Sequence, residues 1–312
     1  MAGGRAAFDA MLAGNAAGRP AWLPIIDELA GRVQSRSYRE TTADPDLWGA
    51  GLTRAGELLG ADALVVGCEA TLGAEACGAE LDWSTPLPRV ARPPAELVAS
   101  PPESRRQAAM LEVLRRLRTT ARGRFGVVAA TCGPLRLATQ VSPALAPEEA
   151  LRRVKVAHGG ILEALLATRP DLMLLMEQLP EPETPVFKAW QRAFGTLRNL
   201  AGHYDVPLAL LAQDWSAGQI AGLATLRLPV YLLGRGCGDA LQAARALATA
   251  PTAVGVPLPL EPGNDPQATL DSVAAARAEG CNCFLTTAGG IGGQGDLGAL
   301  RDIAAELQRR AA

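Results

Sequence analysis

The sequence has few of the residues that mark common metal and nucleophile sites. It contains two histidines and six cysteines in 312 residues, and no two cysteines have the C-x-x-C spacing of a structural zinc site. His158 and His203 fall within helical patterns, and no nucleophile elbow is present. We therefore predict no metal site, and we interpret most cysteines as small buried apolar residues. Aspartate and glutamate remain as the general acids or bases.

Excess charge and long apolar runs are also absent. The net charge is −2, which lacks the basic excess of a nucleic-acid-binding protein. No run of 18 apolar residues occurs, so we expect no membrane span. Residues 1–15 include Asp9 and no long apolar run, so they do not resemble a secretory signal, and we expect a cytoplasmic location. Aromatic residues make up only 4%, so the core must be mainly Ala, Leu and Val.

Short apolar runs recur along the chain, and each is followed by a helical pattern. Continuous apolar runs are typical of parallel strands that are buried on both faces. Eight strand-then-helix units predict an α/β protein, a single (β/α)8 TIM barrel spanning 1–312. A doubly wound open sheet is the alternative. The predicted strands are 22–26, 63–68, 125–131, 172–177, 207–213, 230–234, 252–258 and 283–287.

The helical segments carry recognisable end signals. Residues 44–60 begin with Asp44 as an N-cap and Pro45 at the first helical position, and they end at Gly60. Residues 147–168 have apolar positions at helical spacing. The Pro-rich stretch 70–105 is interpreted as an elaborated loop. Four more helices are predicted, at 187–204, 238–250, 265–280 and 296–310.

Polar residues follow several of the predicted strands, and barrel enzymes place their chemistry at these carboxyl ends. Glu69 follows the second strand, Glu177 and Gln178 the fourth, and Asp214 the fifth. Each carboxylate has an alternative role as a helix N-cap or as the partner of an arginine. The clustering at one end of the barrel is nevertheless the pattern expected of a substrate site.

Arginines accumulate after the first strand. Arg32, Arg36 and Arg39 lie within eight residues, and Arg136 follows the third strand. Guanidinium groups bind carboxylate or phosphate in bidentate fashion, so they suit an anionic small-molecule substrate. The alternative is a solvated loop that pairs with Glu40 and Asp44. The glycine-rich segment 289–295 fits either an anion cradle or a tight turn.

Several motifs, in order along the chain, resemble those of the uroporphyrinogen decarboxylase family. The first is "RPAWLPIIDELAGRVQSRSYRE" followed by "DPDLW", which resembles the family's N-terminal signature. The others are "LLGADALVVGCEATLGAEACGAELDW", "GVVAATCGPLRLAT", "ATRPDLMLLMEQ" and "TTAGGIGGQGDLGALRDI". The resemblance implies a barrel and a decarboxylation that needs no cofactor. It assigns Glu69 the charge-stabilising role and Arg32 the binding of substrate carboxylates.

The sequence departs from the family at four positions. Glu69 stands where the family has Asp, and Gln140 stands where it has Tyr. Gln178 replaces a Ser, and Gly290 replaces a His. The superfamily also includes corrinoid-linked methyltransferases, which bind zinc through His-x-Cys and a later Cys. Here "QDW" (213–215) and Ala288 occupy those places, so the resemblance implies no zinc.

The leading hypothesis is a cofactor-independent carboxy-lyase that acts on a carboxylate-bearing small molecule. Its catalytic residues would be Glu69 and Arg32. The alternatives are a methyltransferase that works with a corrinoid protein and a barrel that binds without catalysis. The resemblance alone suggests a homodimer. The predicted substrate-binding residues are Arg36, Arg136, Gln140, Glu177, Gln178, Asp214 and Gly290.

Overall fold

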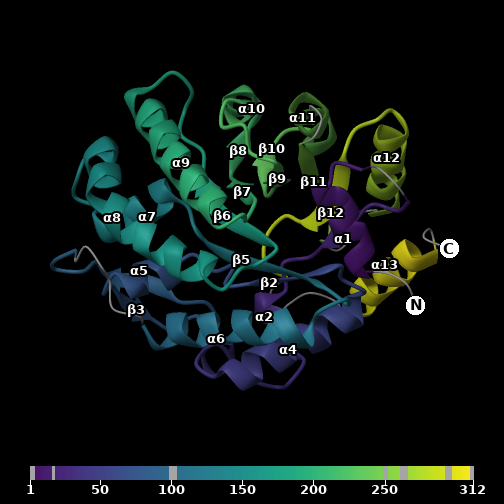
Figure 1. Cartoon of the computed structure of the whole chain (residues 1–312), viewed down its shortest axis with the longest axis horizontal. Coiled ribbons are helices and arrows are strands. Elements are labelled where there is room, and N and C mark those ends of the chain that lie inside the picture. Colours follow the sequence, from purple (N-terminus) through teal and green to yellow (C-terminus); the bar gives the residue numbers. More distant parts are fainter. Residues whose placement is uncertain are drawn as a thin grey trace.

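Eight parallel strands form one sheet at the centre of the computed structural model, which describes residues 4–15, 18–97, 104–248, 252–260, 266–291 and 297–309 (Figure 1). Strands that follow one another in this series pair in parallel, except the first and the second, which form the two ends of the sheet. All eight predicted strands are confirmed. Their bounds are β1 (Trp22–Leu23), β2 (Ala63–Val66), β5 (Gly126–Cys132), β6 (Leu172–Gln178), β7 (Leu208–Gln213), β9 (Val230–Leu233), β11 (Ala253–Leu258) and β12 (Cys283–Thr287).

The first and second strands meet and bring the sheet close to a closed barrel. The backbone N–H of Asp62 donates to the carbonyl of Trp22 at 2.9 Å. The backbone N–H of Trp22 donates to the Asp62 carboxylate at 2.7 Å, and Arg19 pairs with the same carboxylate. These bonds join β1 to the start of β2. The (β/α)8 TIM barrel is therefore confirmed, and the open doubly wound sheet is wrong.

Apolar side chains fill the barrel and the layer around it. One cluster lies inside the strands, where Phe8 and Met11 of helix α1 (Gly4–Leu12) pack with inward residues such as Val65 and Phe284. A larger cluster fills the space between strands and helices. His158 belongs to this outer layer, and its Nε2 lies 3.0 Å from the carbonyl of Cys132. Burial lowers the pKa of His158 to about 4, so it is a neutral core residue near pH 7.

The helices begin and end where local sequence dictates. In α4, Asp44 caps the backbone N–H groups of Asp46 and Leu47, and Gly60 adopts the left-handed conformation after the last turn. The six helices predicted by residue range are confirmed. The helices are α1 (Gly4–Leu12), α2 (Asp27–Arg32), α3 (Tyr38–Thr42), α4 (Pro45–Leu59), α5 (Leu72–Ala76), α6 (Arg105–Thr120), α7 (Pro134–Val141), α8 (Pro147–Leu166), α9 (Pro185–His203), α10 (Ala217–Ala224), α11 (Ala240–Leu247), α12 (Pro266–Ala278) and α13 (Leu297–Arg309).

The Pro-rich stretch 70–105 contains more than a loop. It holds the short helix α5 and an antiparallel hairpin of β3 (Glu80–Asp82) and β4 (Arg89–Arg92). Its residues 98–103 lie outside the described part. Two short strands, β8 (Trp215–Ser216) and β10 (Gly236–Cys237), pair beside the barrel. These four strands escaped prediction because each has only two to four residues.

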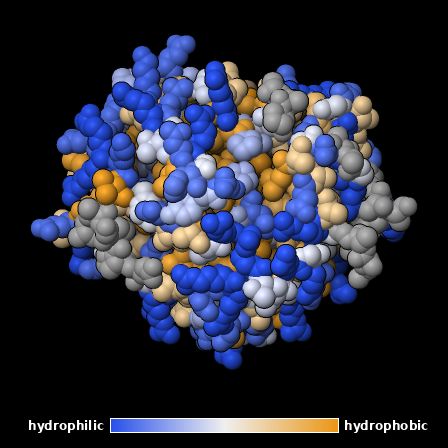
Figure 2. Space-filling view, viewed as in Figure 1, coloured by the Kyte–Doolittle hydropathy of each residue, from blue (hydrophilic) through white to orange (hydrophobic). Residues whose placement is uncertain are grey.

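The surface carries mostly hydrophilic side chains on the face shown in Figure 2, with apolar ones in small separate patches. Among the described residues, no helix has the length and hydropathy needed to cross a membrane. The cysteines are free: Cys77, Cys132 and Cys283 are buried, Cys68 and Cys281 are half-buried, and Cys237 is exposed.

Candidate functional site

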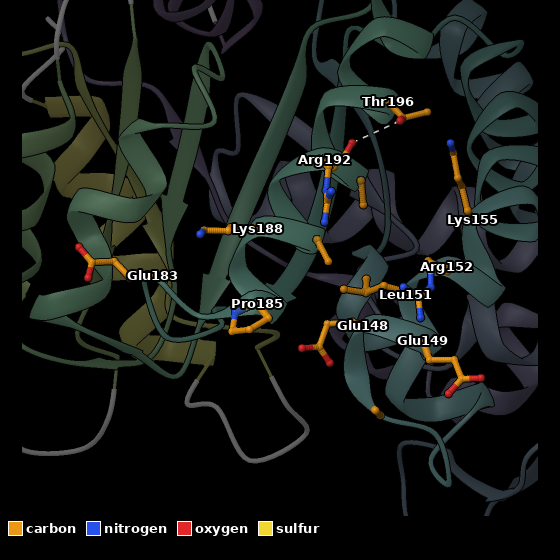
Figure 3. Close-up of a pocket in the computed structure, with 13 residues that line it drawn as sticks. Glu148, Glu149, Leu151, Arg152, Lys155, Glu183, Pro185, Lys188, Arg192 and Thr196 are labelled. Atoms are coloured by element: carbon orange, nitrogen blue, oxygen red, sulfur yellow. Dashed lines mark hydrogen bonds between the residues drawn. The ribbon is translucent and has the colours of Figure 1, made fainter.

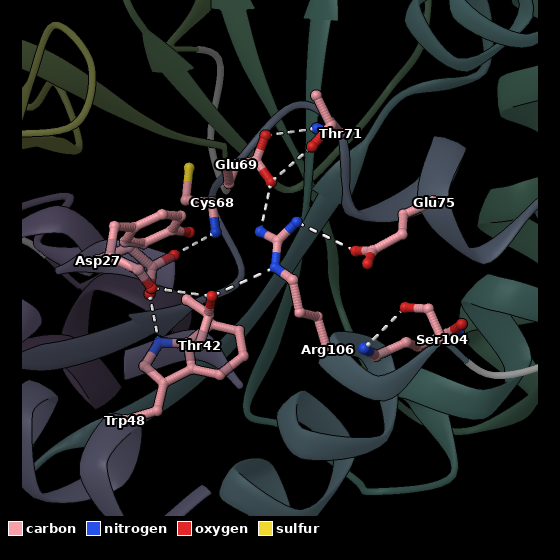
Figure 4. A network of polar contacts seen from close by, with 11 residues as sticks. Asp27, Thr42, Trp48, Cys68, Glu69, Thr71, Glu75, Ser104 and Arg106 are labelled. Carbon is pink, nitrogen blue, oxygen red and sulfur yellow. Dashed lines mark hydrogen bonds and ion pairs between the residues drawn. The ribbon is translucent and has the colours of Figure 1, made fainter. Parts of the chain in front are cut away.

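Glu69 follows β2 at the carboxyl end of the barrel, and the residue is 6% exposed. One carboxylate oxygen accepts from the backbone N–H of Thr71 at 2.6 Å, and the other accepts from the Thr71 hydroxyl at 3.0 Å. The guanidinium of Arg106 donates to that second oxygen at 2.7 Å (Figure 4). Glu69 is therefore held on both oxygens by groups of this chain.

Arg106 is the buried cation of the site, and the sequence analysis missed it. It comes from the first turn of α6 and is 4% exposed. It also binds Glu75 at 3.0 Å and the Thr42 hydroxyl at 3.2 Å. A signal was present, because Arg106 lies in register with the buried positions Ala109, Met110, Val113 and Leu117 of the same helix. An arginine on an apolar stripe requires an acidic partner.

Asp27 lies beside this pair, in the first turn of α2 directly after β1. Its side chain is 2% exposed. It accepts from the indole N–H of Trp48 at 3.0 Å and from the backbone N–H of Cys68 at 2.5 Å (Figure 4). Burial raises the pKa of Asp27 to about 7, with a further increase from the charge of Glu69. Asp27 can thus hold or release a proton near neutral pH.

Glu28 is the next acid on the same turn and is half-buried. Burial and the negative charge of Glu69 raise the pKa of Glu28. A Cβ atom at Gly290 would lie 2.9 Å from the Glu28 carboxylate. A side chain at this position would therefore displace the Glu28 carboxylate from its present place. The rest of the glycine-rich segment, residues 292–296, lies outside the described residues.

Glu177, at the end of β6, is fully buried and is held by neutral donors. It accepts from the backbone N–H groups of Leu135, Arg136 and Gln178 and from the indole of Trp190. The first two groups belong to the first turn of α7, where backbone N–H groups lack partners within the helix. Burial raises the pKa of Glu177 to about 7. Glu177 therefore joins β6, α7 and α9 through these hydrogen bonds.

The arginines of the first loop are exposed at the surface. Arg32 and Arg36 are exposed, and Arg36 lies 4.0 Å from Glu40. The Arg39 guanidinium stacks 5.3 Å from the ring centre of Trp83. The cation that meets Glu69 is thus Arg106 and comes from α6. The substrate-binding roles predicted for Arg32 and Arg36 stay predictions.

Arg136 and Gln140 lie one turn apart on α7 and are both half-buried. Within the described chain, the Arg136 Nε and the Gln140 Oε1 are buried without a hydrogen-bond partner. Buried polar atoms of this kind are rare and point to a missing partner. Gln178 and Asp214 are exposed at the same end of the barrel, where the Gln178 amide donates to the Asp214 carboxylate at 3.3 Å.

Gln213 and Ala288, which stand where the related methyltransferases have zinc ligands, also lie close together here. The Gln213 amide lies 3.5 Å from the carbonyl of Ala288, so β7 and the end of β12 converge as expected. An amide and an alanine do not supply the thiolate or imidazole that zinc prefers. In the described part of the chain, no three His, Cys, Asp or Glu side chains are grouped to hold a metal ion.

A separate hollow of about 870 Å³ lies between α8 and α9 (Figure 3). Its walls carry both signs of charge, and no strand-end acid contributes to them. The charged side chains are Glu148, Glu149, Arg152, Lys155, Glu183, Lys188 and Arg192, most of them exposed. This hollow is therefore a surface groove and is distinct from the acid cluster.

Comparisons with known proteins agree on the fold. Residues 6–153 match the family described as uroporphyrinogen decarboxylase (URO-D). A methyltransferase from Methanosarcina mazei superposes with a TM-score of 0.76 and 18% identity over 99% of this chain and 99% of its own. A comparison with curated protein sequences gives no match.

Two further solved structures share the fold at lower similarity. A putative vitamin-B12 independent methionine synthase from Listeria monocytogenes has a TM-score of 0.59 and 9% identity over 94% of this chain and 95% of its own. A B12-independent methionine synthase from Shewanella sp. W3-18-1 has a TM-score of 0.55 and 13% identity over 94% of this chain and 98% of its own. Identities this low show the barrel alone. The family match to residues 6–153 agrees with the uroporphyrinogen decarboxylase resemblance of the N-terminal motifs.

Proposed function

We propose that the protein is a methyltransferase that acts on a small methyl-bearing molecule at the carboxyl end of its barrel. The observation that carries this proposal is the correspondence of nearly the whole chain with a methyltransferase, at a TM-score of 0.76. Two methionine synthases share the same barrel. This choice reverses the order of our sequence hypotheses, in which decarboxylation came first.

The state of Glu69 supports the same choice. In the decarboxylase reading, its carboxylate must stabilise positive charge that develops on the substrate. Here its two oxygens already accept from Thr71, and Arg106 neutralises its charge at 2.7 Å. A carboxylate that already pairs with a guanidinium stabilises a second cation less, because the positive guanidinium repels that cation.

Methyl transfer makes a different demand on the site. The bond between the methyl carbon and nitrogen, oxygen or sulfur breaks, the electron pair stays on that atom, and the methyl group passes to a nucleophile. A corrinoid carried by a partner protein would supply that nucleophile. Asp27, with a pKa of about 7, can give a proton to a departing alkoxide or take one from an acceptor. Glu28 is half-exposed beside it and can relay that proton to solvent.

The zinc-dependent form of this chemistry does not fit the residues present. Gln213 and Ala288 stand where thiolate and imidazole ligands would be needed. The proposed reaction therefore excludes a zinc-bound thiol acceptor. The exposed residues Gln178, Asp214 and Arg235 lie along the rim that a corrinoid protein would approach.

Decarboxylation remains the second candidate because of two specific observations. The family match over residues 6–153 is to the decarboxylase. The loop after β1 also keeps exposed arginines, which suit a polycarboxylate.

One pair of assays separates the two functions. Reduced cobalamin is mixed with the protein and, in turn, methanol, methylamines, N-methylated amino acids and methyl aryl ethers, and its absorbance reports methylation. We expect methylation with one donor class and a loss of at least about 100-fold in kcat/KM on Glu28→Gln. Glu149→Gln, on α8 outside the site, is the matched control. Conversion of uroporphyrinogen, seen by chromatography, with no methylation from any donor would overturn the proposal.

A further inference from the structure

Tyr38 carries a buried hydroxyl without a partner. It begins α3, its side chain is 7% exposed, and in the described chain its hydroxyl makes no hydrogen bond. Leaving a buried hydroxyl unpaired costs free energy, so such a group requires an explanation. The charges that act on it identify its surroundings, namely Asp27, Glu69, Arg106 and Cys68. The Arg106 guanidinium also lies 5.9 Å from the centre of the Tyr38 ring, so the Tyr38 side chain lies beside the acid cluster.

This cluster holds more negative than positive charge. Glu69 and Glu75 share the single guanidinium of Arg106. Asp27 and Glu28 add two more carboxyl groups, and neither has a basic partner among the ion pairs of the described residues. The Glu69 charge disfavours ionisation of both acids. A cation placed here would relieve that repulsion.

Arg136 provides the opposite charge nearby. Its Nε is buried and unpaired, and its charge acts on the Cys68 thiol. The backbone N–H of Cys68 binds Asp27 on the other side. Cys68 is half-buried, and its sulfur lies 3.2 Å from that of Met176 at the top of the barrel core. A guanidinium whose Nε lacks a partner among the described residues thus lies near Cys68, which also binds Asp27 of the acid cluster.

We propose that the methyl-bearing substrate is a small zwitterion, an N-methylated amino acid. Its ammonium N–H donates to the Tyr38 oxygen beside Asp27 and Glu28, and its carboxylate meets Arg136. Both unpaired buried groups thereby gain partners, and the excess negative charge is compensated. This inference rests on the proposed methyl transfer and specifies its substrate class. Loss of a methyl group from the protonated nitrogen leaves a neutral amine, and the nitrogen retains the electron pair.

Matched ligands test the ammonium group. N,N-dimethylglycine and isovalerate have the same shape, but isovalerate has a neutral CH in place of the charged N–H. Calorimetry on the whole protein, without cobalamin, should show millimolar or tighter binding of dimethylglycine and at least about tenfold weaker binding of isovalerate. Glu28→Gln and Arg136→Gln should each weaken dimethylglycine binding by about tenfold, whereas Glu149→Gln should leave it unchanged.

Tyr38→Phe gives the most decisive result, because binding and stability should move in opposite directions. Removing an unpaired hydroxyl should keep or raise the unfolding temperature, yet it should weaken dimethylglycine binding by about tenfold. Glycine betaine has no N–H, so its affinity should change less than about twofold. Equal binding of isovalerate, or no effect of Tyr38→Phe on dimethylglycine binding, would overturn the inference. Methylation of cobalamin by methanol or an aryl ether, without zwitterion binding, would contradict this substrate class alone and would still support methyl transfer.

Discussion

Glu69 and Glu177 occupy equivalent places in the barrel and have different surroundings. Glu69 follows β2 and Glu177 lies at the end of β6, both at the carboxyl end of the barrel, and each is buried. Glu177 accepts from three backbone N–H groups and one indole, all neutral. Glu69 meets the guanidinium of Arg106, close to two other acids. Position at a strand end does not therefore assign a role.

The type of partner separates the two regions. Backbone donors are fixed in place, so Glu177 ties the start of α7 to β6, and its predicted role in substrate binding stays a prediction. A Cβ atom at Gly133 would lie 2.5 Å from its carboxylate, which shows how closely the chain packs there. The Glu69 region has uncompensated charge and unpaired polar atoms, and a ligand can supply what it lacks.

The largest effect is expected at Glu177. Glu177→Ala leaves several buried donors without an acceptor, and each costs about 1–3 kcal/mol, so we expect a loss of about 4 kcal/mol in the free energy of unfolding. Urea denaturation measures this loss. Glu183→Ala, in the exposed turn before α9, is the control and should change stability little. A loss of unfolding free energy under about 1 kcal/mol would contradict the structural role of Glu177.

A smaller effect is expected when the Glu69–Arg106 pair is broken. Glu69→Gln keeps an acceptor for Thr71 and leaves Arg106 with Glu75, so we expect a loss of about 2 kcal/mol. A double-mutant cycle with Arg106→Met isolates the pairwise part of this loss. Ligand binding should also fall with Glu69→Gln, which distinguishes it from Glu177→Ala. Additive effects of the two substitutions would show that the pair has no coupling.

The sequence predicted the barrel well because the signals for it are local. Apolar runs such as 172–177 mark buried strands, and Asp44 and Gly60 mark the ends of α4. The site was harder to predict. Glu69 was found from its place after β2, but its partner Arg106 lies 37 positions later in the chain. Only the packing of α3, α5 and α6 around β2 brings them together, and no local pattern encodes that distance.

The pH dependence of stability sharpens the comparison further. Burial raises the pKa of Asp27 from 3.8 to about 7, so the native state keeps a proton that the unfolded chain releases. Stability from this group is complete below pH 3.8 and is lost as the pH rises toward 7. Asp27→Asn should reduce the fall in unfolding free energy by roughly 1 kcal/mol per pH unit in this window.

Urea denaturation between pH 4 and 7 provides the measurement. Glu177 contributes in the same direction, because its pKa is also raised to about 7. His158 contributes in the opposite direction, because its pKa is lowered to about 4 and its stabilisation is lost as the pH falls below about 6.5. His158→Gln should therefore steepen the fall that Asp27→Asn reduces. Equal slopes of unfolding free energy against pH for wild type and Asp27→Asn would show that the raised pKa does not belong to Asp27.

The smallest effect is expected in the first loop, at Arg36. Its guanidinium lies 4.0 Å from Glu40, and both side chains are more than half exposed, so their attraction is screened by water. Glu40 owes its place to the capping box with Ser37, which Arg36 does not touch. Arg36→Gln should shift the unfolding temperature by less than about 2 °C. If it instead weakens ligand binding about tenfold while stability is unchanged, the loop after β1 is part of the binding site. A polycarboxylate then becomes the better substrate class.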